Sequence, residues 1–201
     1  MDIEFKISKN PVNYKKALQL LEKRVEEVKK GGRELVWFLE HPTTYTAGIR
    51  YKKEEILDNS INVIKTNRGG KITLHNPGQK IVYFVIDLNR RKKNIRNLVR
   101  EIENIIIKFL KIYKIKSYAD KKNIGIWVNR KKIAAIGIRV SRWVAYHGFS
   151  ININNDLDGY KKIIPCGLDN EKITSFEKEG KESFNINRNL RNIFLKNLPK
   201  I

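Results

Sequence analysis

Six consecutive apolar residues, Ile81 to Ile86, fill the middle of residues 80–88 and constrain the fold of this chain more than any other segment. Successive side chains of a strand point to opposite faces of a sheet, so an apolar run without alternation predicts a strand covered on both faces. Its β-branched and aromatic residues favour a strand over a helix. The sequence therefore predicts a buried strand.

Helical segments lie on either side of this strand in the sequence. Residues 11–30 and 95–113 carry apolar residues at intervals of three and four, the spacing that gives a helix one apolar face. Residues 187–195 predict a final helix that packs on the sheet, and residues 156–163 predict a short helix.

Shorter apolar runs predict further strands at residues 34–39, 62–65, 71–74, 124–128, 132–140 and 144–153. Asn129, Arg130 and Lys131 join two of them in a predicted tight hairpin. No repeat, low-complexity linker or heptad run divides the chain. We therefore expect residues 1–201 to form a single domain of the α+β class.

The formal net charge of +21 indicates attraction to polyanions, but its distribution argues against nucleic acid as the partner. Lysine, asparagine and isoleucine are abundant from end to end, which is typical of a bias in base composition. Pairs such as Lys121-Lys122 are short and scattered, without the interleaved aromatic residues of a nucleic-acid surface. An acidic protein substrate would still be attracted by this charge.

The sequence also predicts a soluble, cytoplasmic protein. Residues 1–5 lack the basic and apolar regions of a secretory signal, and no apolar stretch reaches the roughly 18 residues that span a bilayer. A single cysteine forms no internal disulfide, and a chain of this length can close a core without one. We expect no membrane partner.

Glycine-rich blocks contain all three histidines, His41, His75 and His147. The histidines are not paired at metal-ligand spacings, so we expect no metal site. Arg68-Gly69-Gly70 lacks the spacing of a Walker loop or a Rossmann fingerprint, which leaves an ordinary turn or a close approach to a ligand as its two interpretations.

Cys166 is the only cysteine and lies between Pro165 and Gly167. A lone cysteine is more often a buried apolar residue than a nucleophile. Its position among the glycine-rich blocks makes acyl transfer through a thiol the first hypothesis.

Taken together and in this order, five blocks resemble the lipoyl(octanoyl) transferase family: EHPTTYTAG at 40–48, TNRGGKITLHNPGQ at 66–79, KIAAIG at 132–137, HGFSININ at 147–154 and IIPCGL at 163–168. The resemblance extends over about residues 35–176. It implies the fold of biotin and lipoate protein ligases, a mixed and mostly antiparallel sheet flanked by helices. One departure is Asn76, where the family usually has glycine; asparagine tolerates a left-handed backbone better than most residues.

The resemblance implies that Cys166 carries the acyl group as a thioester and that Lys132 lies beside it. An ordinary thiol has a pKa of about 8.5. A nearby ammonium favours the thiolate, and the same lysine could relay a proton when an amine attacks the thioester. Without the resemblance, Lys132 would be interpreted as an exposed hairpin lysine.

The resemblance also implies which residues bind the acyl chain: Arg68, Gly69, Gly70, Lys71, Ile72, Thr73, Leu74, His75, Ala135, Ile136, Gly137, Gly148, Phe149 and Ser150. His147 and Gln79 are candidate supporting residues, with structural hydrogen bonding as the alternative. Burial of an acyl chain contributes about 0.8 kcal/mol per CH₂ group, so pocket depth would determine the preferred chain length.

By the same resemblance we expect a monomeric octanoyltransferase without a cofactor. Its donor would be octanoyl-acyl carrier protein, and its acceptors would be lipoyl domains of 2-oxoacid dehydrogenases and the glycine-cleavage H protein. One alternative is an ATP-dependent lipoate–protein ligase of the same fold. A second, from a different class, is a non-enzymatic basic module that binds RNA or membranes.

Overall fold

The strand predicted near residues 80–88 is β6 (Gln79–Asp87), and it lies inside the main sheet of the molecule. The computed structural model describes residues 3–120, 123–165 and 172–201. Within these residues the main sheet has seven strands, in the order β1 (Ile3–Ile7), β2 (Glu34–Leu39), β6, β10 (Val144–Asn152), β9 (Lys131–Ser141), β8 (Ile126–Val128) and β7 (Tyr118–Ala119). Only β1 and β2 pair in parallel, so the sheet is mixed and mostly antiparallel, as expected.

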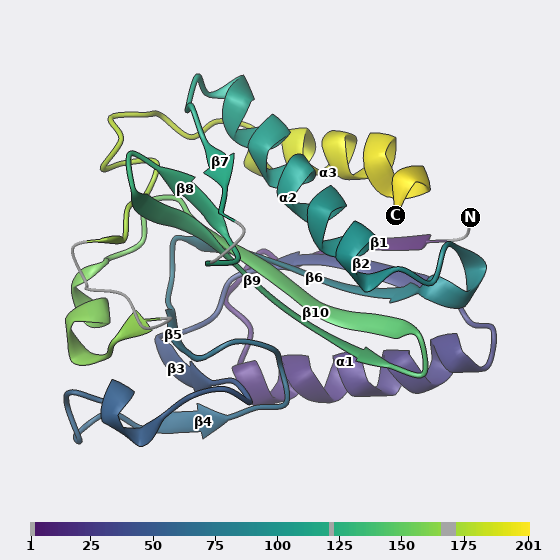
Figure 1. Ribbon diagram of the computed structural model, residues 1–201, viewed down its shortest axis with the longest axis horizontal. Helices are drawn as coiled ribbons and strands as arrows, with labels where there is room; N and C mark the ends of the chain where they lie inside the picture. The colour runs from purple at the N-terminus through teal and green to yellow at the C-terminus, as the bar shows by residue number, and fades with distance from the viewer. Residues whose placement is uncertain (1–2, 121–122, 166–171) are drawn as a thin grey trace.

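A second, smaller sheet contains β4 (Val63–Lys65), β3 (Thr44–Ala47) and β5 (Ile72–His75) in that order. β3 is parallel to β4 and antiparallel to β5. Figure 1 shows this sheet on the same side of the main sheet as the first helix.

Helices cover both faces of the main sheet (Figure 1). α1 (Tyr14–Lys29) lies on one face, and α2 (Ile95–Ile112) and α3 (Ile186–Asn197) lie on the other. Side chains of Asn13 and Asn94 accept backbone hydrogen bonds at the starts of α1 and α2, which caps both helices. No helix in the described part of the chain has the length and apolar content that crossing a bilayer requires.

The two faces of β6 explain its unbroken apolar run. Val82, Phe84 and Ile86 pack in the core beneath α2 and α3. Ile81, Tyr83 and Val85 pack in the core beneath α1. The prediction of a strand covered on both faces is confirmed.

Several short elements complete the fold. The predicted short helix at 156–163 is the 3-10 helix η3 (Asp158–Lys162); further 3-10 helices in the described part of the chain include η1 (Lys53–Glu55), η2 (Leu88–Arg90) and η6 (Leu198–Lys200). The sequence analysis missed β1, β3 and β7. β7 has only two residues, and β3 lies inside a block that was interpreted by its polar and glycine residues.

The predicted hairpin is present between β8 and β9. Its turn contains Asn129 and Arg130, with φ angles of 47° and 64°, while Lys131 already belongs to β9. Two consecutive left-handed residues are typical of the tight turns that join antiparallel strands. This turn places Lys132 at the start of β9.

Candidate functional site

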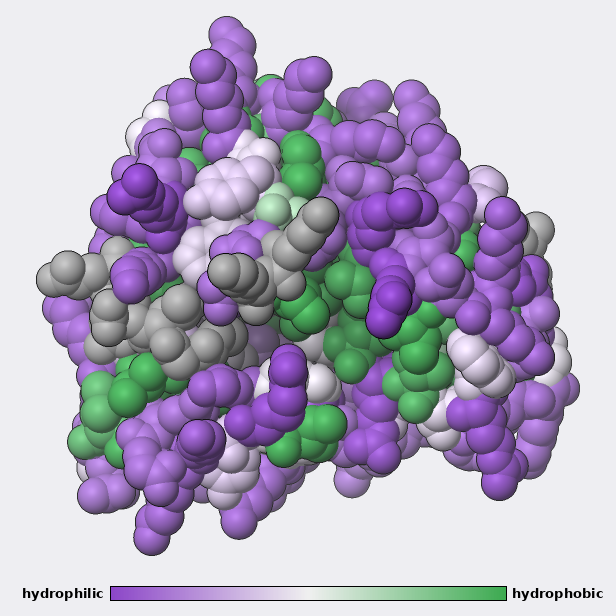
Figure 2. Space-filling view, in the orientation of Figure 1, coloured by the Kyte–Doolittle hydropathy of each residue, from purple (hydrophilic) through white to green (hydrophobic). Residues whose placement is uncertain are grey.

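A cleft lies between the main sheet and the small sheet, on the α1 side. It contains about 480 Å³ of atom-free space, counting the part open to solvent. Figure 2 shows apolar side chains gathered near the centre of the face turned toward the viewer. It is lined by Arg68, Gly70, Lys71, Thr73, His75, Ile81, Tyr83, Ala135, Ile136, Gly137, His147, Gly148, Phe149 and Ser150. Most residues predicted to bind the acyl chain therefore surround one cleft.

The cleft has a shallow side and a deep side. On β9, Ala135, Ile136 and Gly137 are half-buried. On the neighbouring strands, Ser150 of β10 and Tyr83 of β6 are only 6% exposed each. Because β6 lies beneath α1, the cleft is closed on that side.

Alternation along β5 corrects part of the predicted lining. Thr73 and His75 line the cleft, whereas Ile72 and Leu74 point to the opposite face of the strand and pack in a separate core cluster with Tyr45. A strand directs every second side chain to the same face, so a contiguous run could not all line one pocket. Ile72 and Leu74 contribute to the small sheet's own core instead.

Gly69 is also displaced from its predicted place in the lining. Its α-carbon lies against the backbone of Ile138 on β9, where an added β-carbon would come 2.9 Å from the carbonyl oxygen. Gly69 therefore allows the loop before β5 to approach β9 closely, behind the lining residues.

Arg68 joins three parts of the site. One terminal nitrogen, Nη2, donates to the backbone oxygen of Thr46 at 2.7 Å and to its hydroxyl at 2.9 Å, and Nη1 donates to the carbonyl of Gly69 at 3.0 Å. Its aliphatic stem lies against Gly137, where an added β-carbon would be 3.4 Å from Cδ. Among the described residues, Nε of this buried side chain has no hydrogen-bond partner.

The three histidines gather with two tyrosines behind and along the deep side of the cleft. His41 contacts the rings of Tyr14, His75 and Tyr83, with centroids 5.1, 5.7 and 5.6 Å away. The ring of Tyr83 also contacts that of His147, at 6.4 Å. The sequence placed the three histidines in separate glycine-rich blocks, Tyr14 on a predicted helix and Tyr83 on a predicted strand.

Burial keeps these imidazoles uncharged at neutral pH. Removal from water lowers the pKa of His41 to about 4, that of His75 to about 3 and that of His147 to about 3. The neutral form fixes the proton on His41: Nδ1 donates to the carbonyl of Val12 at 2.6 Å, so Nε2 accepts from the hydroxyl of Tyr83 at 2.9 Å.

His147 reaches the cleft through an unusual backbone. Its φ angle is 68°, in the left-handed region that a non-glycine residue seldom adopts inside a strand. The ring stacks on that of Tyr146, its neighbour in the chain, and Nε2 donates to Asn67 at 2.8 Å. Both side chains therefore reach the same face of the sheet.

The next residue, Gly148, has no room for a side chain. A β-carbon there would lie 1.9 Å from the carbonyl oxygen of Val82 on β6. The His-Gly step is thus required by the backbone of β10, independently of any contact with a ligand.

Gln79 supports His75 from outside the cleft. Nδ1 of His75 donates to the side-chain oxygen of Gln79 at 2.7 Å. The side-chain nitrogen of Gln79 lies within 3.2 Å of oxygen atoms of Leu74, Asn152 and Tyr160. Its predicted supporting position is compatible with this geometry, in which it orients the histidine ring.

Asn76 keeps the turn before β6 without a left-handed backbone. The φ angle of Asn76 is not positive. Its side-chain nitrogen donates to the backbone oxygen of Asp156 at 2.7 Å, and its side-chain oxygen accepts from the side chain of Asn155 at 3.0 Å. The left-handed position in this turn belongs to Gly78, with a φ of 84°. Side-chain hydrogen bonds therefore replace the conformational freedom of glycine.

Lys132 lines a second cavity that lies beside the cleft. Its side chain is buried, with Nζ donating to the carbonyl of Ile124 at 3.1 Å and lying 5.0 Å from the ring centre of Trp127. This cavity, of about 270 Å³, shares Thr73, Ala135 and Ser150 with the cleft and is also lined by Pro165 and Ile173. Among the described residues, no carboxylate forms an ion pair with Lys132.

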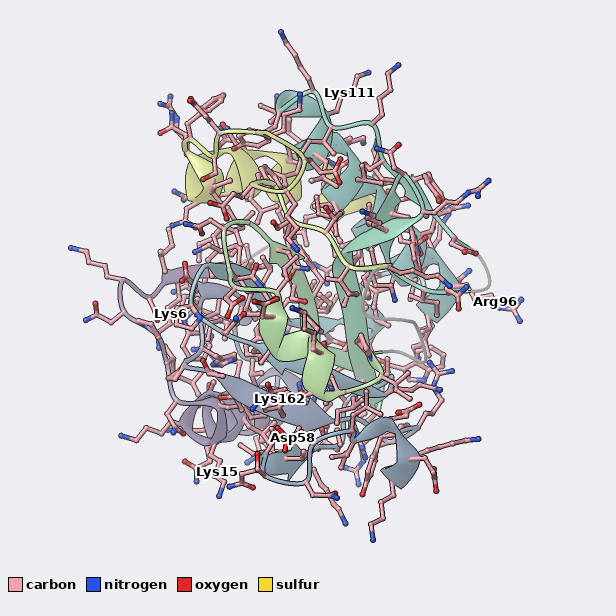
Figure 3. The ribbon with its side chains drawn as sticks, turned by 90° about the vertical axis from the view of Figure 1, so that its left-hand side faces the viewer. Lys6, Lys15, Asp58, Arg96, Lys111 and Lys162 are labelled. Atoms are coloured by element: carbon pink, nitrogen blue, oxygen red, sulfur yellow. The ribbon has the colours of Figure 1, made fainter. Side chains whose placement is uncertain are left out.

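Cys166 and Gly167 lie outside the described residues, but the chain on both sides of them is anchored. Ile164 donates its backbone N–H to Glu55 at 2.8 Å, and Lys162 and Asp58 point toward one another and pair at 3.0 Å (Figure 3). On the other side, Ile173 pairs with Lys132 through an isolated parallel bridge.

Surface charge has no single focus. Lys6, Lys15, Arg96 and Lys111 project from different parts of the molecule in Figure 3. Within the described residues, no three histidine, acidic or cysteine side chains come together as a group that could hold a metal ion.

Sequence reasoning missed the contribution of β6 to the cleft. Ile81 and Tyr83 line it, yet the run from 81 to 86 does not reveal which residues face which side. The hydroxyl of Tyr83 was the available signal, because a buried phenol requires a polar partner.

Comparison with known proteins supplies two kinds of similarity. The family described as the lipoyl protein ligase A/B catalytic domain matches residues 13–196. The octanoyltransferase of Anaplasma phagocytophilum is 46% identical over 189 residues, which cover 90% of this chain and 91% of that protein.

Solved structures share the fold at much lower identity. Lipoate-protein ligase A bound with ATP aligns with a TM-score of 0.79 at 16% identity, over 98% of this chain and 86% of the other. The biotin protein ligase of Leishmania major, in complex with biotinyl-5-AMP, aligns with a TM-score of 0.60 at 13% identity, over 98% and 73%. The expected fold class is confirmed.

Proposed function

The chain belongs to the lipoyl protein ligase A/B catalytic domain family and is an acyltransferase that handles octanoyl groups in protein lipoylation, and we propose that it works through a thioester on Cys166. One observation carries this proposal. The side chain of Lys132 lines a cavity that Pro165, the residue before Cys166, also lines and that shares Thr73, Ala135 and Ser150 with the cleft. A nucleophile, a proton carrier and an acyl pocket can thus be neighbours.

In the first half-reaction, the thiolate of Cys166 attacks the carbonyl carbon of the octanoyl thioester on an acyl carrier protein. The new carbon–sulfur bond forms as the bond to the carrier's sulfur breaks. Lys132 stabilises the attacking thiolate and then gives a proton to the leaving carrier thiolate, which departs as a thiol. Lys132 is left as a neutral amine.

In the second half-reaction, the neutral amine of an acceptor lysine attacks the thioester carbonyl. An amide bond forms, the bond to the sulfur of Cys166 breaks, and the excess proton on the attacking nitrogen passes to Lys132. The thiolate and the ammonium are thereby both restored. No cofactor takes part in the proposed cycle.

The cleft is suited to the acyl chain during both steps. Its half-buried side on β9 lets the chain enter, and its buried side holds uncharged rings. Burial of an eight-carbon chain contributes about 0.8 kcal/mol for each CH₂ group, which supports several kcal/mol of binding.

We propose octanoyl-acyl carrier protein as the donor, and lipoyl domains of 2-oxoacid dehydrogenases and the glycine-cleavage H protein as acceptors. The net charge of +21 favours encounters with acidic partners of this kind. We propose that the protein is cytoplasmic, because a catalytic thiol must stay reduced. We also propose that it is a monomer and that residues 1–201 form one catalytic domain.

Intact-protein mass spectrometry tests the thioester directly. Incubation with octanoyl-acyl carrier protein should add one octanoyl mass to the protein, and alkaline hydroxylamine should remove it. The Cys166→Ser variant should form no thioester, because it lacks the thiol. An unmodified wild-type protein would contradict the mechanism, and a requirement for ATP and free acid would favour a ligase. RNA binding that weakens with salt, together with the absence of an acyl adduct, would favour the binding module.

A further inference from the structure

We propose that the ring of Tyr83 is the end wall of the acyl cleft and that it sets the longest chain the protein accepts. The inference rests on the proposed acyl transfer and adds a specificity-determining residue to it. It depends on the depth of the cleft, the support behind the ring and the way its polar atom is used.

The depth of the cleft identifies the closed end. From β9 the cleft crosses β10 to β6, a distance of two strand spacings or about 10 Å. The register places Gly137, Gly148 and Tyr83 opposite one another on these three strands. All three residues line the cleft, and Tyr83 is the only one of them with a large side chain.

The ring of Tyr83 is held firmly from behind. Its hydroxyl donates to Nε2 of His41, which is fully buried and held by the carbonyl of Val12. Trp37 packs beside the ring, with the two ring centres 6.4 Å apart. Neither Tyr14 nor His41 lines the cleft. The ring therefore cannot swing away without breaking these contacts.

The wall offers carbon atoms to the cleft. The hydroxyl of Tyr83 is hydrogen-bonded to His41, and Nδ1 of His75 is hydrogen-bonded to Gln79. These two polar atoms therefore need no partner from a bound apolar chain. The terminal methyl group of an octanoyl chain can contact ring carbons without leaving a buried donor unpaired. A longer chain would have to displace the ring.

The test compares acyl donors of six to twelve carbons with the full-length protein. Tyr83→Ala should raise the ratio of kcat/KM for decanoyl over octanoyl donors by about tenfold, because space for one or two methylene groups changes discrimination by that order. Tyr83→Phe keeps the ring and should keep the wild-type ratio. Trp37→Leu, a matched change of a buried neighbour outside the cleft, should lower stability and leave the ratio unchanged.

A second variant and a second readout keep the test decisive. If Tyr83→Ala does not fold, Tyr83→Leu should still move the ratio in the same direction. Thermal shifts with free octanoate and decanoate measure chain-length preference without transfer. This inference alone is overturned if the wild-type protein transfers octanoyl groups and the Tyr83→Leu variant keeps the wild-type kcat/KM ratio and fatty-acid preference. The proposed function is overturned if the wild-type protein transfers no acyl group. In that case the thermal shifts with fatty acids still decide the role of Tyr83.

Discussion

The carbonyl oxygen of Lys132 accepts a hydrogen bond from the backbone nitrogen of Thr174 at 3.0 Å. This bond, with the adjacent bridge to Ile173, joins β9 to the chain that follows Cys166. Lys132 therefore also anchors the described chain that resumes after Cys166, the proposed nucleophile. Its side chain and its backbone have separate tasks, which substitutions can separate.

Lys132→Met should slow thioester formation by roughly 10²–10⁴-fold while the fold is retained, because the methionine keeps the contact with Trp127 but has no proton to give. Stopped reactions followed by intact mass provide the rate. Lys131→Met, at the exposed neighbouring position, is the matched control and should react at the wild-type rate.

Arg68→Met should lower the free energy of unfolding by about 2 kcal/mol, since hydrogen bonds from a charged donor to Thr46 and Gly69 are lost. Urea denaturation measures the loss. Arg139→Met removes an arginine from an exposed position of β9 and should change stability by no more than about 0.5 kcal/mol. Equal losses in both variants would show that Arg68 does not brace the small sheet.

His147→Val should be less stable than His147→Asn by about 1 kcal/mol or more. Both variants lose the imidazole, but asparagine tolerates a φ of 68° and a β-branched residue does not. Comparing the two by urea denaturation isolates the backbone term. If they unfold at the same denaturant concentration, the left-handed conformation carries no cost.

Stability should fall as the pH is lowered from about 6.5 toward 4. The buried histidines have pKa values of about 4 (His41), 3 (His75) and 3 (His147), below the ordinary 6.5. The unfolded chain therefore binds protons that the folded chain does not, so the stability is complete above pH 6.5 and is lost as pH falls toward the folded pKa values.

Each histidine should contribute a slope of up to about 1.4 kcal/mol per pH unit within that window. Denaturation curves of His41→Gln across pH 4–7 should show a shallower dependence than the wild type. An unchanged slope would mean that His41 is protonated in the folded protein.

The main elements of the fold could be predicted from the sequence because its periods are clear. The strand at 34–39 was predicted with its observed bounds, and the helices at 11–30 and 95–113 differ from α1 and α2 only at their ends. The orientation of Ile72 and Leu74 away from the cleft could have been predicted, since β5 alternates and only every second residue can face a pocket.

Other features of the site need three-dimensional information. The run around Tyr83 is apolar on both faces, so periodicity does not orient it. His147 has a φ of 68°, and nothing in the letters His-Gly specifies it. The burial of Lys132 contradicts the ordinary expectation for a hairpin lysine; family resemblance alone had suggested a role for it.

The acyl cleft and the large core beneath α2 lie on opposite faces of one sheet. Val82 and Phe84 pack in that core, while Ile81 and Tyr83, at alternate positions of the same strand, line the cleft. Substitutions at Val82 and Phe84 should therefore leave the cleft lining unchanged, whereas substitutions at Ile81 and Tyr83 alter the cleft and the core beneath α1 together, so a change of selectivity on this strand carries a cost in stability.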